Sequence, residues 1–175
     1  MKVLVLFTFA VLGCSLAGAR IVSKCELRDK LKEMFESLPT MRDTGMEKGR
    51  FLAKVVCHVE QRSGFNTSAV TEKAINNAQA AQMFGDDEVT LYGLFQFPEG
   101  LVCSSDSKSK PNMCNLACEE LTDDNISDDI KCVGKLFTLM MKKAFMMEKP
   151  EKLFKVLKNL IDDDCHDVQD YFSDC

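Results

Sequence analysis

The chain has 175 residues and a formal net charge of −5 at pH 7, from 27 acidic and 22 basic side chains. This length suits one domain. A net negative protein is repelled by phosphate backbones and anionic lipid headgroups, which argues against nucleic acids and membrane surfaces as partners.

The N-terminus has the features of a targeting segment. A short positive start precedes an apolar run, and the small residues Ala17-Gly18-Ala19 follow. This order predicts a secretory signal peptide over residues 1–19 and a mature domain over residues 20–175. A membrane anchor needs about 20 apolar residues, and residues 13–15 interrupt this run. We therefore expect a secreted, extracellular protein.

Export changes the meaning of the cysteines. Eight of them lie outside the predicted signal peptide: Cys25, Cys57, Cys103, Cys114, Cys118, Cys132, Cys165 and Cys175. An even number in a small secreted chain predicts a disulfide framework, although about 105 pairings are conceivable. Zinc is the competing use of cysteine, but only two histidines and no pair of Cys-x-x-Cys motifs accompany them.

Helical patterns dominate the rest of the chain. Apolar residues recur at three- and four-residue steps in three segments, which predicts helices over residues 24–38, 46–62 and 127–145. A fourth helix is predicted after Pro150, with apolar positions from Leu153 to Ile161. In the middle, Glu88 to Phe97 is rich in β-forming residues and predicts one or two short strands or an extended segment. Residues 104–112 have the composition of a loop.

Several motifs in a fixed order relate this chain to a known family. They are KCEL (24–27), SGFNT (63–67), LYGLFQF (91–97), CNLAC (114–118) and DDNISDDIKC (123–132). Together they resemble the c-type lysozyme and α-lactalbumin family, which is glycoside hydrolase family 22. The resemblance implies an α+β, mainly helical fold, with a helical lobe and a small β lobe. It also implies four disulfides: Cys25–Cys175, Cys57–Cys165, Cys103–Cys118 and Cys114–Cys132.

The acidic segment between Cys118 and Cys132 needs a physical explanation, because dense like charge destabilises a compact state. The resemblance to the calcium-binding branch of the family implies a Ca²⁺ site there. Its ligands would be three carboxylates and two backbone carbonyls, supplied by Asp123, Asp128 and Asp129 and by Glu120 and Asn125, respectively. Oxygen ligands of this kind suit Ca²⁺. The alternative is that the two aspartates at 128–129 are only helix-start acids, which the helix dipole favours. An EF-hand is excluded, because its glycine and closing glutamate would fall on Asp128 and Gly134.

The two carboxylates of lysozyme chemistry have no counterparts at the expected positions. The resemblance assigns those positions to Arg62 and Leu91, and a guanidinium cannot donate a proton at working pH. Glu60 lies about 200° away around a helix, and Glu88 lies roughly 10 Å earlier along a strand. The chain also has no tryptophan, whereas family lysozymes line the sugar cleft with it, and Val102 occupies one such position. No catalytic residue is therefore assigned.

The galactosyltransferase-modifying role of α-lactalbumin is not supported either. Gln61 stands at a histidine position of that protein, and no tryptophan precedes Cys165. We expect a secreted, monomeric, calcium-binding lysozyme-like protein without hydrolytic activity, which acts by binding an unidentified glycan or protein. One alternative is an active hydrolase that uses Glu60 or Glu88, and another is a structural or storage-type protein. Asn66 and Asn125 begin glycosylation sequons, of which Asn66 is expected to be the more accessible.

Overall fold

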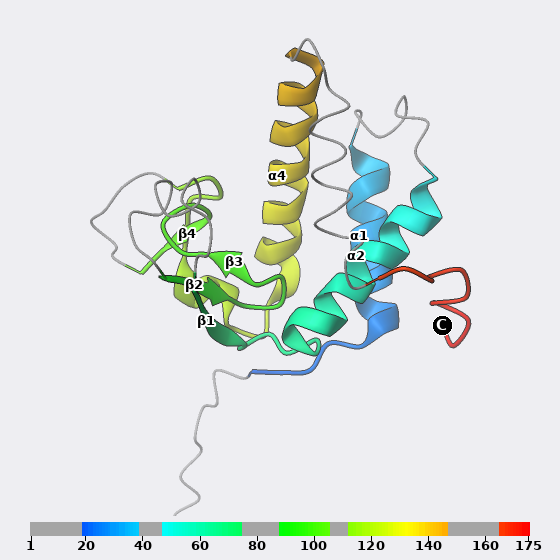
Figure 1. Ribbon diagram of the computed structural model, residues 1–175, viewed down its shortest axis with the longest axis horizontal. Coiled ribbons are helices and arrows are strands. Elements are labelled where there is room, and N and C mark those ends of the chain that lie inside the picture. Colours follow the sequence, from blue (N-terminus) through cyan, green and yellow to red (C-terminus); the bar gives the residue numbers. More distant parts are fainter. Residues whose placement is uncertain (1–18, 39–46, 75–87, 106–111, 147–164) are drawn as a thin grey trace, which may run out of the picture.

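The computed structural model describes residues 19–38, 47–74, 88–105, 112–146 and 165–175. The elements are helices α1 (Lys24–Ser37), α2 (Lys48–Ser63) and α4 (Ile126–Met146), the 3-10 helix η2 (Cys118–Leu121), and strands β1 (Val70–Ala74), β2 (Glu88–Tyr92), β3 (Phe97–Pro98), β4 (Cys103–Ser104) and β5 (Leu116–Ala117). Figure 1 shows α1 and α2 on one side of α4 and the strands on the other. The predicted α+β, mainly helical architecture with two lobes is confirmed.

The helices begin and end within two residues of the predicted bounds. Helix α1 begins after Ser23, whose hydroxyl accepts a hydrogen bond from the Glu26 amide at 3.1 Å, a standard N-cap. The three helices meet at an aromatic cluster in which the rings of Phe35, Phe51 and Phe137 lie 5.4–5.8 Å apart. Edge-to-face pairs at this distance stabilise the fold beyond the free energy gained by burying the rings. The fourth predicted helix lies outside the described residues.

The β lobe contains a three-stranded antiparallel sheet in the order β1-β2-β3. Strand β2 lies within residues 88–97, where one or two short strands or an extended segment were predicted, and β3 begins at the last of these residues. A second, parallel pair joins β4 to β5. Strand β1 and this pair were not expected from the sequence. The side chain of Ser63, at the end of α2, donates a 2.7 Å hydrogen bond to the Leu94 carbonyl in the turn between β2 and β3, so the two lobes are joined there.

Four disulfides join cysteines among the described residues, and they are the four that the family resemblance implies. Two of them span long stretches of sequence, because Cys25–Cys175 joins residues 150 apart and Cys57–Cys165 joins residues 108 apart. Each disulfide contributes about 2–4 kcal/mol by restricting the unfolded chain. Within the described part of the chain, none of the helices combines the length and the apolar character that a membrane crossing requires.

Gly93 sits where the β lobe touches η2. Its φ is +74°, and a Cβ built there would overlap the carbonyl oxygen of Leu121. Gly100 has the similar φ of +78° but open space around its Cα. We expect Gly100→Ala to cost about 1–2 kcal/mol through backbone strain alone. Gly93→Ala is expected to cost about 1–3 kcal/mol more, because the Leu121 backbone must move.

Urea denaturation of both variants measures this difference in the free energy of unfolding. Equal losses in the two variants would show that the Leu121 backbone moves aside without cost when a side chain is added at position 93.

Candidate functional site

The acidic loop, residues 119–129, runs from η2 into the first turn of α4. Three side chains in it stabilise its turns. A carboxylate oxygen of Glu120 accepts the Ala117 amide at 2.7 Å, and Asp123 Oδ1 accepts the Asn125 amide at 2.8 Å. Asn125 Oδ1 accepts the Ser127 amide at 3.3 Å and so caps α4. The loop is thus ordered by its own side chains before the helix starts.

Asp129 is buried because of its position on α4. It follows Ile126 by three residues and directly precedes Ile130, and both isoleucines belong to the core, so it shares the inward face of the helix. Its side chain is 3% exposed, and its Oδ1 has no hydrogen-bond partner among the described residues. Asp128 Oδ1 is likewise buried and unpartnered there. An uncompensated buried carboxylate is costly, so this pair destabilises the protein by itself.

The pKa values of the loop acids also reflect this lack of charge compensation. Burial raises the pKa of Asp129 to about 8, and repulsion from Asp128 and then Asp123 adds to the shift. Burial also raises the pKa of Asp128, followed by repulsion from Asp123 and Glu120. Three predicted carboxylate ligands therefore interact with one another in the fold.

The same side chains do not yet form a closed cage. In the described ranges, no three aspartate, glutamate, histidine or cysteine side chains converge closely enough to hold a metal ion as they stand. The donor set nevertheless fits a hard divalent cation, because it consists of oxygen atoms and includes two buried carboxylate oxygens that lack partners. The side chains of Glu120 and Asn125 are engaged with backbone amides, so any role for these residues falls to their carbonyls.

The raised pKa of Asp129 predicts an unusual pH dependence in metal-free protein. An aspartate in the unfolded chain has a pKa of about 3.9, and here the folded value is about 8. The unfolded state therefore holds fewer protons between these values, and stability is lost as the pH rises through this window. We expect the melting temperature of the metal-free protein to fall from pH 5 to pH 8. Asp129→Asn should remove the part of this fall that is due to Asp129. If the variant and the parent lose stability in parallel, Asp129 does not titrate in this window.

The two positions expected to carry lysozyme chemistry lie near the junction of the lobes. Arg62 is exposed in the last turn of α2, next to the Ser63 that reaches the β2–β3 turn. Leu91 is half-buried in β2, where it pairs with Thr71 and Pro98. Neither side chain can act as a general acid, a base or a carboxylate nucleophile.

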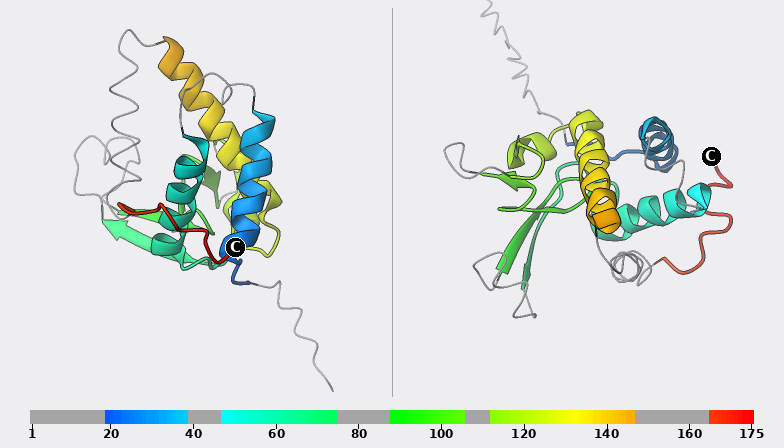
Figure 2. Two further views of the ribbon diagram at one scale, coloured as in Figure 1. Left: turned by 90° about the vertical axis from the view of Figure 1, so that its right-hand side faces the viewer. Right: turned by 90° about the horizontal axis from the view of Figure 1, so that it is seen from above.

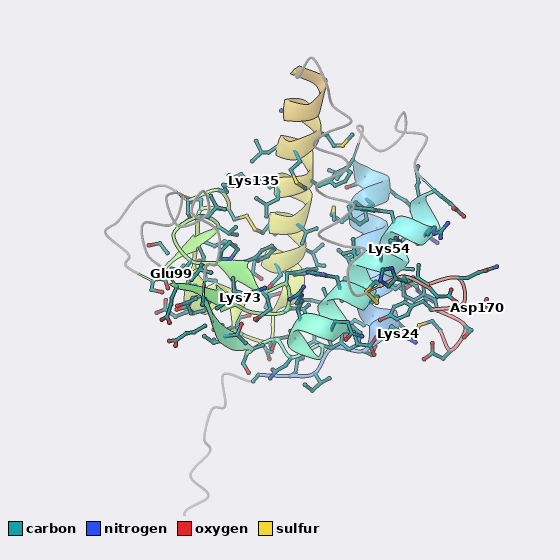
Figure 3. All side chains as sticks on the ribbon, in the orientation of Figure 1. Lys24, Lys54, Lys73, Glu99, Lys135 and Asp170 are labelled. Atoms are coloured by element: carbon teal, nitrogen blue, oxygen red, sulfur yellow. A yellow bond between two sulfur atoms is a disulfide. The ribbon has the colours of Figure 1, made fainter. Side chains whose placement is uncertain are left out.

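The displaced carboxylates lie elsewhere. Tyr171 donates a 2.7 Å hydrogen bond to Glu60, and burial, followed by this bond, raises the pKa of Tyr171 so that its hydroxyl stays protonated. Figure 3 shows Asp170, next to Tyr171, on the side of the helices opposite Glu99 in the β lobe. Glu88 is the exposed first residue of β2 and pairs with Ala74. It lies about 13 Å along the strand from Tyr92, the last residue of β2. The two carboxylates therefore belong to different parts of the molecule.

Comparison with known proteins decides the family. The family model described as C-type lysozyme/alpha-lactalbumin family matches residues 20–165. This chain belongs to the C-type lysozyme/α-lactalbumin family. Among curated members, it is 37% identical to the milk isozyme of lysozyme C from Canis lupus familiaris over 119 residues, which cover 67% of this chain and 76% of the relative. It is 30% identical to Homo sapiens alpha-lactalbumin over 141 residues, which cover 77% and 83%, respectively.

Solved structures of the C-type lysozyme/α-lactalbumin family give the same result. The lysozyme from Equus asinus matches with a TM-score of 0.54 at 30% identity, over 89% of this chain and 98% of that one. A calcium-binding lysozyme from equine milk matches with the same score and coverage at 28% identity. The family resemblance places Val102 where lysozymes have a tryptophan that lines the sugar cleft. Val102 is 3% exposed and packs in the core of the β lobe, so it offers no aromatic surface to a sugar.

Sequence reasoning missed one residue that contacts the acidic loop. The guanidinium of Arg20 donates from Nε to the Asp124 carbonyl at 3.0 Å, although the two residues are 104 positions apart. No local pattern indicates this contact, because it depends on how the segment before α1, residues 19–23, packs against the acidic loop (Figure 2).

Proposed function

We propose that this family member is a secreted, calcium-binding, non-hydrolytic protein that acts by binding a glycan or a protein partner. Calcium would be held by carboxylates of Asp123, Asp128 and Asp129 and by carbonyls of Glu120 and Asn125, and it would neutralise charge that the fold otherwise leaves uncompensated. The observation that carries this proposal is the buried carboxylate of Asp129, with an unpartnered oxygen next to a second one on Asp128.

Two further observations support the calcium assignment. The pKa of Asp129 is raised by burial and by neighbouring acids, so a divalent cation that binds there would relieve both costs. The family also contains a protein described as a calcium-binding lysozyme from equine milk, which this chain resembles in fold. Calcium is favoured over magnesium, because flexible all-protein oxygen cages suit the larger ion.

The lack of hydrolytic machinery is supported by Arg62 and Leu91, which stand where the family chemistry requires carboxylates. The alternative of an active hydrolase would need Glu60 or Glu88, but Glu60 is bonded to Tyr171 and Glu88 lies at the far end of β2. A scaffold that retains the fold and loses the chemistry is suited to binding.

Calorimetric titration of metal-free protein with calcium tests the metal part directly, with magnesium as the matched comparison. One calcium per chain, bound much more tightly than magnesium, is the expected result. Retention on immobilised peptidoglycan fragments then tests a glycan partner. Absence of any specific glycan or protein ligand would favour the structural or storage-type alternative.

The two sequons can be examined on the same secreted protein by mass spectrometry. Asn125 is exposed, and its Oδ1 forms the helix cap, so a glycan on its nitrogen would leave the cap and the carbonyl in place. Asn66 is half-buried, and its Oδ1 accepts bonds from both the amide and the hydroxyl of Ser68 at 3.0 Å. Asn125 is therefore the more accessible acceptor in the folded protein, contrary to the expectation from the sequence.

A further inference from the structure

Arg20 connects parts of the chain that are far apart in sequence. Its Nη1 and Nη2 donate to the two carboxylate oxygens of Glu26 at 2.9 and 2.8 Å, a bidentate pair. Its Nε donates to the Asp124 carbonyl at 3.0 Å. One planar side chain therefore holds α1 with one edge and the acidic loop with the other, which the rigid guanidinium fork allows.

The backbone of Arg20 is fixed as well as its side chain. Its amide donates to Thr67 Oγ1 at 3.0 Å, and the Thr67 amide donates to the Arg20 carbonyl at 3.0 Å. Thr67 is 1% exposed, so this anchor belongs to the protein interior. The nitrogen of Arg20 remains a donor whether it is a peptide amide or the free amine left by cleavage after Ala19. The backbone from which the Arg20 side chain extends is therefore held in place by Thr67.

The contact falls at a sensitive place in the loop. Asp124 lies between Asp123 and Asn125, two of the proposed ligand positions, and Asp123 Oδ1 holds the Asn125 amide at 2.8 Å. The same three-residue turn is therefore fixed by Asp123 from within and by Arg20 from outside. A loop that is already ordered loses less conformational freedom when it closes around an ion.

We infer that Arg20 is a positioning residue for the acidic loop, which binds no ion itself but orders the loop backbone for calcium through the Asp124 carbonyl. This inference rests on the proposed calcium site. By linkage, calcium and the Arg20 contact stabilise each other, and couplings of this kind are typically 5- to 150-fold in affinity.

A purely electrostatic role and a positioning role of Arg20 predict opposite changes in calcium affinity when Arg20 is replaced. A cation near the site repels Ca²⁺, so a purely electrostatic Arg20 would weaken binding, and Arg20→Ala would tighten it. A positioning Arg20 predicts weaker binding in Arg20→Ala, by roughly tenfold. Arg20→Lys keeps the charge and loses the fork, so it should not restore the affinity.

The experiment is calcium titration by calorimetry at 20 °C, with circular dichroism of each variant at the same temperature to verify that it is folded. Arg28→Lys is the matched control. Arg28 is also in the N-terminal region and also pairs with an acid, Asp29, at 2.8 Å, and its guanidinium lies over Phe172 of the C-terminal segment. We expect the control to bind calcium as the parent does.

The outcomes separate the two claims. If the parent binds calcium and Arg20→Lys binds equally well, or Arg20→Ala binds more tightly, the positioning role is wrong and the calcium site stands. If the parent binds no calcium, the proposed function fails and the inference fails with it. Weaker binding in both Arg20 variants, with Arg28→Lys unchanged, supports the inference.

Discussion

Removing calcium is expected to lower the melting temperature of this protein by about 5–10 °C. Calcium at 100 times its dissociation constant stabilises a folded state by about 2.7 kcal/mol, and each kcal/mol corresponds to roughly 2–4 °C for a chain of this size. The physical reason is that Asp128 and Asp129 each carry a buried carboxylate oxygen without a partner among the described residues. Thermal unfolding followed by circular dichroism, with calcium and then with excess chelator, measures the difference.

Two isosteric variants separate ligation from general charge. Asp129→Asn should abolish the calcium response, because it removes a proposed ligand. Asp124→Asn removes the same charge from the same loop but leaves intact the carbonyl that Arg20 contacts, so its response should persist. An equal loss in both variants would mean that calcium acts only by screening the loop, and no loss in either would mean that the ion binds elsewhere or not at all.

No lysis of bacterial cell walls is expected from this protein between pH 4 and pH 9. A positioned general acid alone contributes about 10²–10⁴-fold to a rate, and the family resemblance assigns that position to Arg62 and the position of the second carboxylate to Leu91. Turbidity loss of a wall suspension, with a milk lysozyme assayed in parallel, measures the activity. We expect a rate below that of the lysozyme by at least about 10²-fold.

Glu60→Gln and Glu88→Gln complete this test. Both variants should be as inactive as the parent, with Glu60→Gln also losing the carboxylate that Tyr171 bonds. Measurable lysis by the parent that disappears in either variant would establish the displaced-carboxylate hydrolase instead.

The helices could be predicted from the sequence because burial imposes its period on the residues. Leu27, Leu31 and Phe35 follow one another at four-residue steps, and all three are buried in α1. Strand β1 could not be predicted, because all five of its residues are exposed and VTEKA has no apolar alternation. The two-residue strands β4 and β5 are too short for any periodic pattern.

The candidate site was predictable in part. The motif DDNISDDIKC contains the acids, but only the fold reveals that Asp129 is buried while Asp124 is exposed. The role of Arg20 depends on its contact with Asp124, 104 residues later in the sequence. No local rule predicts such a contact. The disulfide pairing likewise followed from the family and not from the number of cysteines.

The bridge between Cys25 and Cys175 closes nearly the whole domain into a covalent ring. A protease that cuts this ring once opens it without releasing a fragment, because both new ends remain attached through sulfur. The other three bridges cross-link the ring further. The domain can therefore survive any single cut between Cys25 and Cys175 in one piece for as long as its cystines stay intact.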